Sequence, residues 1–272
     1  MIGEDRILKI IRHALEYDRL ALFGQRSVPL SSTGEKKRRI EILMRLVMED
    51  QRVIPPDVFI PVAERSGLIH SLDRYLIRKV FSILAGEMEH REELSEGVNL
   101  NVSGATVSQP KFRDYVVQAL AYYRPRPERI CFEITETAAI TDLDAAKEFV
   151  TCMQSMGAEV ALDDFGLGFS TLGYLQQLPV NYLKIPASFV KQILTTPVDQ
   201  TMVEFICKLA KRAGMETVAE GVEDRDTMHF LQTLGCDHVQ GYLLHRPEPW
   251  PALDRGSQNE VLQFPVRCRV AH

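Results

Sequence analysis

Short apolar runs alternate along the chain with longer segments whose apolar positions repeat every three or four residues. The runs predict eight strands, near residues 20–24, 40–46, 97–102, 129–134, 158–163, 180–185, 215–219 and 238–242. The periodic segments predict helices near residues 57–65, 72–88, 111–122, 142–156, 187–212 and 225–234. Strands that alternate with helices in this way are typical of an α/β protein with a parallel sheet or barrel.

The connection between the first two predicted strands is short and polar. Residues 31–39 read Ser-Ser-Thr-Gly-Glu-Lys-Lys-Arg-Arg. A connection of this length favours an antiparallel hairpin, so we expect the barrel to be irregular at its first strand. We interpret the cationic run at residues 36–39 as the solvated tip of this hairpin, rather than as a contact with nucleic acid or a membrane surface.

The pattern divides the chain into three parts. Residues 1–19 contain an amphipathic helix near 5–18, which either packs on the domain or arrives as a linker from an upstream domain. Residues 20–250 carry the alternation of strands and helices, and residues 251–272 form a polar tail to which we assign no function. A chain of 272 residues is compatible with one large barrel domain.

Composition excludes several classes of protein. Hydrophobic residues make up 45% and charged residues 25% of the chain, as in a soluble globular protein with a large core. The net charge of −5 gives no basic field for binding a nucleic-acid polymer. The five cysteines are scattered without a Cys-x-x-Cys pair, which favours a reducing compartment over a disulfide framework or a zinc ribbon.

No apolar run reaches the ~18 residues of a membrane span, and the first residues lack the apolar core of a signal peptide. We therefore expect a cytoplasmic segment without membrane contact, either as a soluble protein or as the cytoplasmic domain of a membrane-bound one.

Polar side chains recur at or just past the ends of the predicted strands. They are Glu41, Asn101, Glu133, Asp163, Asp164, Lys184, Glu220 and Gln240. Because parallel strands of a barrel end on one rim, we expect these side chains to build one site. Five carboxylates in one pocket repel one another unless cations lie between them. Oxygen ligands without histidine or thiolate favour Mg²⁺ or Mn²⁺, and two such ions with Lys184 would bring the pocket close to neutral charge.

The two adjacent aspartates leave an apolar strand and enter a glycine-rich loop. Neighbouring strand residues point to opposite faces, so Asp163 and Asp164 reach one site only where the backbone turns. Gly166 and Gly168 supply the freedom for that turn. The loop lacks the third glycine of a dinucleotide-binding motif, because residue 171 is threonine.

Taken singly, the other motifs have plainer interpretations. Lys184 alone would be an ordinary solvated lysine, and Gln240 alone a structural hydrogen-bonding residue. A Glu-x-x-Glu pair such as Glu133 and Glu136 is common at the start of a helix, where acidic side chains complement the helix dipole. Their joint placement at strand ends favours a site.

Together these motifs resemble the EAL-domain family of bacterial cyclic di-GMP phosphodiesterases, over residues 20–249. The signature segment begins at Glu41 and reads Glu-Ile-Leu-Met-Arg-Leu, with Ile where Ala is usual and Leu where Trp is usual. The other matching segments are Pro-Pro-Asp-Val-Phe-Ile-Pro-Val-Ala-Glu at 55–64, Asn-Val-Ser at 101–103, Glu-Ile-Thr-Glu at 133–136, Asp-Asp-Phe-Gly at 163–166, Leu-Lys-Ile at 183–185, Ala-Glu-Gly-Val-Glu at 219–223 and Gln-Gly-Tyr at 240–242.

The resemblance implies a TIM-like (β/α)8 barrel with an antiparallel first strand, and hydrolysis of cyclic di-GMP to linear 5′-pGpG with two Mg²⁺ or Mn²⁺ ions per site. One ion would be held by Glu41, Asn101, Glu133 and Asp163, and the second by Asp163, Asp164 and Glu220.

The remaining roles also follow from the resemblance. Lys184 and Gln240 would position water or phosphate, and Glu220 would also be the proton acceptor. Gln25 and Arg45 would contact the nucleotide, and Glu136 would anchor the Asp163-Asp164 loop. A homodimer and membership in a larger multidomain sensor protein are expected on the same basis.

Two departures from the family pattern leave an alternative open. Pro186 stands where an aspartate usually follows Lys-Ile, and Leu167-Gly168-Phe169 replaces Thr-Gly-Tyr in the loop. The alternative is a catalytically weak or inactive receptor that binds cyclic di-GMP and passes the signal to a partner. Retention of Glu41 and of the other expected ligands favours the enzyme.

Overall fold

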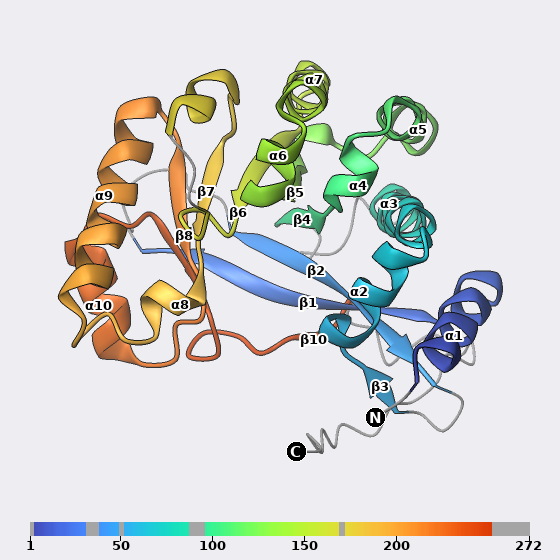
Figure 1. Ribbon diagram of the computed structural model, residues 1–272, viewed down its shortest axis with the longest axis horizontal. Helices are drawn as coiled ribbons and strands as arrows, with labels where there is room; N and C mark the ends of the chain where they lie inside the picture. Colours follow the sequence, from blue (N-terminus) through green and yellow to red (C-terminus); the bar gives the residue numbers. More distant parts are fainter. Residues whose placement is uncertain (1–2, 31–37, 49–51, 87–95, 169–171, 252–272) are drawn as a thin grey trace.

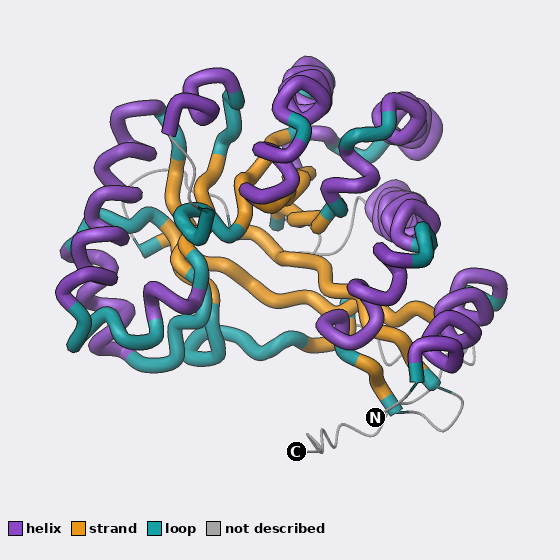
Figure 2. The backbone as a smooth tube through the Cα atoms, in the orientation of Figure 1, coloured by secondary structure: helices purple, strands orange, loops and turns teal. Residues whose placement is uncertain are grey.

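A computed structural model of the protein describes residues 3–30, 38–48, 52–86, 96–168 and 172–251. Within these ranges a closed barrel forms the centre of the molecule, with helices around it (Figures 1 and 2). The barrel strands are β1 (Leu20–Pro29), β2 (Arg39–Val47), β4 (Gly97–Asn101), β5 (Ile130–Thr135), β6 (Glu159–Asp163), β7 (Tyr182–Ile185), β8 (Glu216–Ala219) and β9 (His238–Gln240).

The barrel closes through its first strand. Around the barrel the order is β1-β9-β8-β7-β6-β5-β4-β2, and β2 pairs with β1 again. β1 runs antiparallel to both β2 and β9, whereas the other neighbouring barrel strands are parallel. The prediction of a TIM-like barrel with an antiparallel first strand is therefore confirmed. The β1–β2 pairing runs from Leu20 opposite Leu46 to Ser27 opposite Arg39.

Helices follow most parallel strands and cover the outside of the barrel. They are α1 (Glu4–Glu16), α2 (Pro56–Arg65), α3 (Ile69–Gly86), α4 (Gly104–Val107), α5 (Pro110–Tyr123), α6 (Glu136–Thr141), α7 (Leu143–Ser155), α8 (Ala187–Val190), α9 (Pro197–Ala213) and α10 (Arg225–Thr233). Two short edge strands, β3 (Val53–Ile54) and β10 (Glu248–Pro249), pair with β2 and β1. No helix in the described ranges is long and apolar enough to cross a membrane.

The predicted helix at 187–212 is wrong in its extent. It is divided into α8 and α9 by residues 191–196, and Pro197 occupies the first turn of α9. Proline is favoured in that position because its missing N–H has no partner in the first turn, while inside a continuous helix it would break a hydrogen bond.

Arg39 also departs from the prediction for the cationic run. It is the first residue of β2 and only 3% exposed, so it does not belong to a solvated tip. Arg38 is exposed, and residues 36 and 37 lie outside the described ranges, as does the tail from residue 252 onward.

Helix α1 packs on the barrel domain. Ile7, Ile11 and Ala14 lie at helical spacing on its buried face and join the main hydrophobic core. The helix contacts α2, α3 and strand β2. These contacts agree with the first of the two interpretations given to this helix, in which it packs on its own domain.

This packing predicts that Ile11→Ala destabilises the domain, by about 2–5 kcal/mol, because the fully buried side chain leaves a cavity. Lys9→Ala, at an exposed position of the same helix, serves as the control and should change stability little. Urea unfolding measures both. Equal stabilities of the two variants would show that α1 contributes nothing to the folded domain.

Candidate active site

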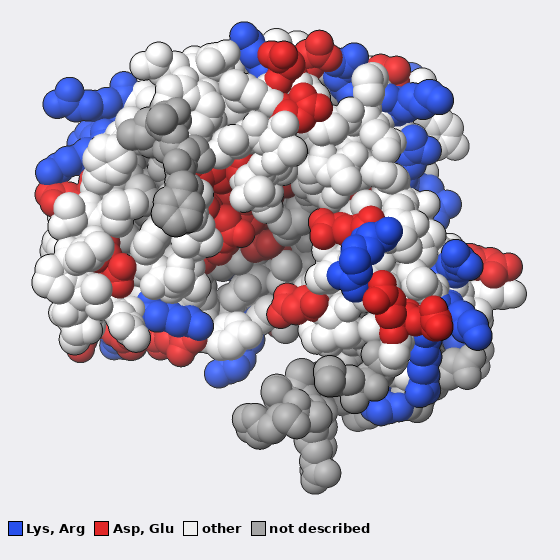
Figure 3. Space-filling view, in the orientation of Figure 1, with Lys and Arg blue, Asp and Glu red and all other residues white. Residues whose placement is uncertain are grey.

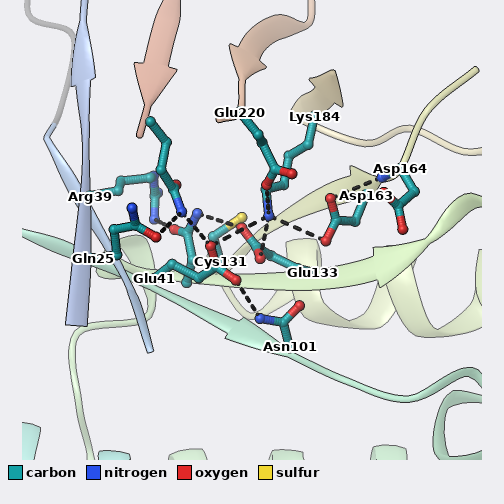
Figure 4. A network of polar contacts seen from close by, with 12 residues as sticks. Gln25, Arg39, Glu41, Asn101, Cys131, Glu133, Asp163, Asp164, Lys184 and Glu220 are labelled. Carbon is teal, nitrogen blue, oxygen red and sulfur yellow. Dashed lines mark hydrogen bonds and ion pairs between the residues drawn. The ribbon is translucent and has the colours of Figure 1, made fainter. Parts of the chain in front are cut away.

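The predicted site residues come from all parts of the barrel. Glu41 lies on β2, Asn101 on β4, Glu133 on β5, Asp163 at the end of β6 and Lys184 on β7. Glu220 directly follows β8, and Gln240 ends β9. Figure 4 labels six of these residues and shows their side chains pointing toward one another: Glu41, Asn101, Glu133, Asp163, Lys184 and Glu220. In the space-filling view, acidic side chains lie in a hollow of this face (Figure 3).

The ammonium of Lys184 lies at the centre of the site and is surrounded by carboxylates. Its Nζ lies 2.7 Å from Glu220 Oε1, 2.9 Å from Glu133 Oε2 and 3.2 Å from Asp163 Oδ2. Glu41 Oε2 is 3.7 Å away. The lysine side chain is only 1% exposed. A buried lysine is stable in this position because opposite charges face it on several sides.

Amide side chains hold Glu41 from the other side. Asn101 Nδ2 donates to Glu41 Oε1 at 2.7 Å, and Gln240 Nε2 donates to Glu41 Oε2 at 2.6 Å. Gln240 also lies 3.4 Å from Gln25 Oε1. The antiparallel pairing of β1 with β2 places Gln25 directly opposite Glu41, which explains how a residue of the first strand reaches this group.

The backbone turn after β6 falls on Asp164. Asp164 has a φ of 55° and Gly166 a φ of 94°, both in the left-handed region. Asp163 reaches Lys184, whereas the carboxylate of Asp164 is turned away from the ammonium and is exposed (Figure 4). Phe165 N donates to the backbone oxygen of Lys184 at 3.1 Å, which holds the start of this loop against β7.

Glu136 binds the loop that follows the two aspartates. Its Oε2 accepts a hydrogen bond from Gly166 N at 2.8 Å, and its Oε1 accepts one from the Tyr174 hydroxyl at 2.7 Å. Glu136 is 4% exposed, so these bonds lie in a buried environment. The carboxylate thus connects the start of α6 to the loop and to the segment beyond it.

Arg45 lies at the edge of the site. It lies four residues beyond Glu41 on β2, on the same face, and its charge helps to lower the pKa of Glu41. Its Nη1 donates to the Met44 backbone oxygen at 3.0 Å, and its guanidinium lies 5.8 Å from the centre of the Phe23 ring.

Close backbone packing joins the last two segments of the site. A Cβ at Gly241 would lie 2.0 Å from the Val222 backbone oxygen, so only glycine fits there. Val222 N donates to Gln240 O at 3.0 Å, and Leu243 N donates to Val222 O at 3.1 Å. These contacts fix the segment after Glu220 beside the end of β9.

Burial and mutual repulsion shift the pKa values of the acidic groups. Burial raises the pKa of Glu133 well above its usual range, with Glu41 and Asp163 adding to the rise and Lys184 opposing it. Burial likewise raises the pKa of Glu220 to about 7. For Glu41, burial is outweighed by Lys184 and by the hydrogen bonds from Gln240 and Asn101, so its pKa is lowered.

The charge of Lys184 is stabilised by the same groups. Burial lowers its pKa, but Asp163, Glu133, Glu220 and Glu41 together raise it well above its usual value. Four carboxylates thus share one ammonium.

Comparison with known families agrees with this geometry. The model of the EAL domain family matches residues 9–247. The chain belongs to the EAL domain family. It is 34% identical over 241 residues to the cyclic di-GMP phosphodiesterase PdeB of Shewanella oneidensis, and 35% identical over 240 residues to the cyclic di-GMP phosphodiesterase PdeF of Escherichia coli. Each match covers 88% of this chain, but only 28% of PdeB and 31% of PdeF.

Solved structures of EAL domains resemble this one closely. The PaMucR phosphodiesterase in complex with c-di-GMP has a TM-score of 0.82 and 31% sequence identity, covering 90% of this chain and 98% of that one. The FimX EAL domain of Pseudomonas aeruginosa, bound to c-di-GMP, has a TM-score of 0.81 and 26% identity, covering 89% and 96%.

The donor set of this EAL domain fits hard divalent cations. Among the described residues, no group of three or more His, Cys, Asp or Glu side chains is already arranged as a metal site. The carboxylates instead face Lys184, and their charge exceeds that of the single ammonium. Burial is the main cause of the raised pKa values of Glu133 and Glu220, and the neighbouring carboxylates add to the rise. Oxygen ligands with surplus negative charge suit Mg²⁺ or Mn²⁺.

Sequence reasoning missed two polar residues beneath the site. Asn99 donates to Glu133 Oε1 at 2.8 Å, and Arg39 donates to Asn99 at 3.2 Å. Both lie two residues before a predicted ligand on the same strand, Asn99 before Asn101 and Arg39 before Glu41. Since side chains two residues apart share a face of a strand, this alternation was the signal that could have found them.

The raised pKa of Glu220 predicts how the metal-free domain responds to pH. Its unfolded-state value is near 4.5 and its folded-state value about 7, so the folded state binds more protons between these pH values. Stability in the presence of a chelator should therefore fall as pH rises from 5 to 7, by on the order of 1–3 kcal/mol.

Urea unfolding at several pH values measures this slope. Glu220→Gln should make the fall shallower but not abolish it, because burial also raises the pKa values of Asp73 and Glu133. Glu16→Gln, at an exposed position of α1, should leave the slope unchanged. A metal-free stability that rises steadily over this pH range would contradict the assignment.

Proposed function

We propose that this EAL domain hydrolyses cyclic di-GMP to linear 5′-pGpG with the help of two divalent cations. The observation that carries the proposal is the convergence of Glu41, Glu133, Asp163 and Glu220 on Lys184 in the barrel centre. Family membership and the names of the relatives PdeB and PdeF support cyclic di-GMP as the substrate.

Two sets of residues would hold the cations. Glu41, Asn101, Glu133 and Asp163 would hold one ion, and Asp163, Asp164 and Glu220 the other. When bound, such a pair activates a water molecule and neutralises charge on the phosphate in an in-line displacement. The surplus of carboxylates over ammonium groups supports this assignment, because it leaves negative charge for cations to compensate.

Glu220 is suited to accept a proton from the attacking water. The family resemblance implies this role for Glu220 in addition to its part in holding the second ion. Lys184 lies 2.7 Å from it and would hold its carboxylate in a fixed orientation. Lys184 and Gln240 would position water or phosphate.

Residues near the rim would bind and orient the nucleotide. Arg45 offers a fork of donors suited to a phosphate, and Gln25 offers an amide for a phosphate or a base. Glu136 would hold the Asp163-Asp164 loop through Gly166, which would fix Asp164 for its ion. Assembly as a homodimer, membership in a larger multidomain protein and a cytoplasmic location stay predictions.

The test is incubation of the purified domain with cyclic di-GMP and excess Mn²⁺ or Mg²⁺, followed by chromatography of the nucleotides. We expect metal-dependent formation of pGpG that a chelator abolishes. Glu41→Gln should lower the rate by at least about 100-fold, since even residues that only support a ligand contribute about 10–100-fold. The matched control Glu16→Gln, at an exposed position, should retain full activity.

Intact nucleotide in the wild-type reaction would contradict the proposal. Binding of cyclic di-GMP to the same sample, measured by calorimetry, would then identify a receptor that does not hydrolyse it. In that case Pro186 and the loop at Leu167 would be the first residues to replace.

A further inference from the structure

A polar chain runs from the floor of the barrel up to Glu133. Arg39 Nη1 donates to Asn99 Oδ1 at 3.2 Å, and Asn99 Nδ2 donates to Glu133 Oε1 at 2.8 Å. The three side chains are 3%, 5% and 1% exposed. We propose that Asn99, held by Arg39, is a positioning residue that orients the Glu133 carboxylate for cation binding. This inference rests on the proposed function.

The two hydrogen bonds that connect Arg39, Asn99 and Glu133 run in one direction, because the Arg39 guanidinium can only donate. A guanidinium has no acceptor, so Asn99 must turn its oxygen toward Arg39 and its NH₂ group toward Glu133. On the other side, Lys184 Nζ donates to Glu133 Oε2 at 2.9 Å. Both oxygens of Glu133 thus face groups that only donate, and this pair of bonds fixes the plane of the carboxylate.

Fixing that plane matters because the last torsion of a glutamate side chain is broad. A terminal sp³–sp² torsion has no narrow staggered wells, so a carboxylate keeps one orientation only if its neighbours impose it. A ligand that is already oriented loses less entropy on binding a cation. Asn99 supplies this constraint without charge, and so adds nothing to the surplus of negative charge.

Arg39 is itself held on several sides. Its guanidinium forms an ion pair with Glu159 of β6 and lies 5.3 Å from the centre of the Tyr182 ring of β7. A Cβ at Gly97, its partner on β4, would lie 2.8 Å from Arg39 Nη1, so glycine leaves the room that the guanidinium occupies. Arg39, which holds Asn99 in place, is therefore itself fixed by contacts with three other strands of the barrel.

The experiment measures Mn²⁺ binding by calorimetry for the wild-type domain, Asn99→Leu and Asn99→Ala, together with the thermal unfolding midpoint of each metal-free protein. Tyr75→Phe is the matched control, because it removes a partly buried hydrogen bond to Asp18 that has no connection to Glu133. We expect the Asn99 variants to bind Mn²⁺ about 10–100-fold more weakly, the usual effect of removing a group that orients a ligand. The control should lower the midpoint but not the affinity.

A kinetic readout separates orientation from folding. At a temperature well below the metal-free unfolding midpoint of each variant, where folding does not limit the rate, raising the Mn²⁺ concentration should restore most of the turnover of the Asn99 variants. If both Asn99 variants are unfolded at the assay temperature, Arg39→Met removes the hydrogen bond from Arg39 to Asn99 instead. We expect the same loss of Mn²⁺ affinity from this variant.

Wild-type Mn²⁺ affinity in any folded variant of Asn99 or Arg39 would overturn the positioning role while leaving the proposed function intact. A wild-type domain that binds no Mn²⁺ would instead overturn the proposed function and this inference with it.

Discussion

The buried ammonium of Lys184 and the four carboxylates around it constrain the rest of this barrel. Removing charged groups from water costs several kcal/mol each, and only close, well-oriented opposite charges offset that cost. The barrel strands must therefore hold Glu41, Glu133, Asp163 and Glu220 within a few ångströms of one amine. Only Asp163 and Glu220 lie at or just past a strand end, whereas Glu41 lies near the start of β2 and Glu133 within β5. Since one ammonium cannot compensate four carboxylates, the site keeps a demand for positive charge.

Several features far apart in the sequence serve this arrangement. The antiparallel first strand brings Gln25 opposite Glu41, and through Gln240 the last barrel strand is bonded to the second. Glu136 bonds to the loop after the aspartates and so ties it to the start of α6. Below the site, a hydrogen bond from Asn99 likewise holds Glu133 in the barrel interior.

The fold could be predicted from sequence because each barrel strand is a short apolar run with a clear end. The antiparallel hairpin also followed from its short connection. The extent of the helix after β7 could not, because the apolar periodicity continues across residues 191–196, where the structure interrupts it before Pro197. The burial of Arg39 depends on pairing with Glu159, a contact that only the closed barrel creates.

For the site, the sequence likewise predicted the positions of some residues but not the orientation of others. A strand end shows where Asp163 must lie, but the orientation of Asp164 depends on its left-handed backbone, which the residue types do not reveal. The joint placement of Lys184 and the carboxylates on the predicted strands predicted that they would share one site, but not which carboxylates would contact the ammonium.

Electron paramagnetic resonance of the domain titrated with Mn²⁺ at neutral pH counts the cations that these carboxylates bind. We expect two bound ions per chain whose spectra show magnetic coupling, as for ions about 3.5–4 Å apart in a two-metal site. A single uncoupled ion, or none, would contradict the two-cation site.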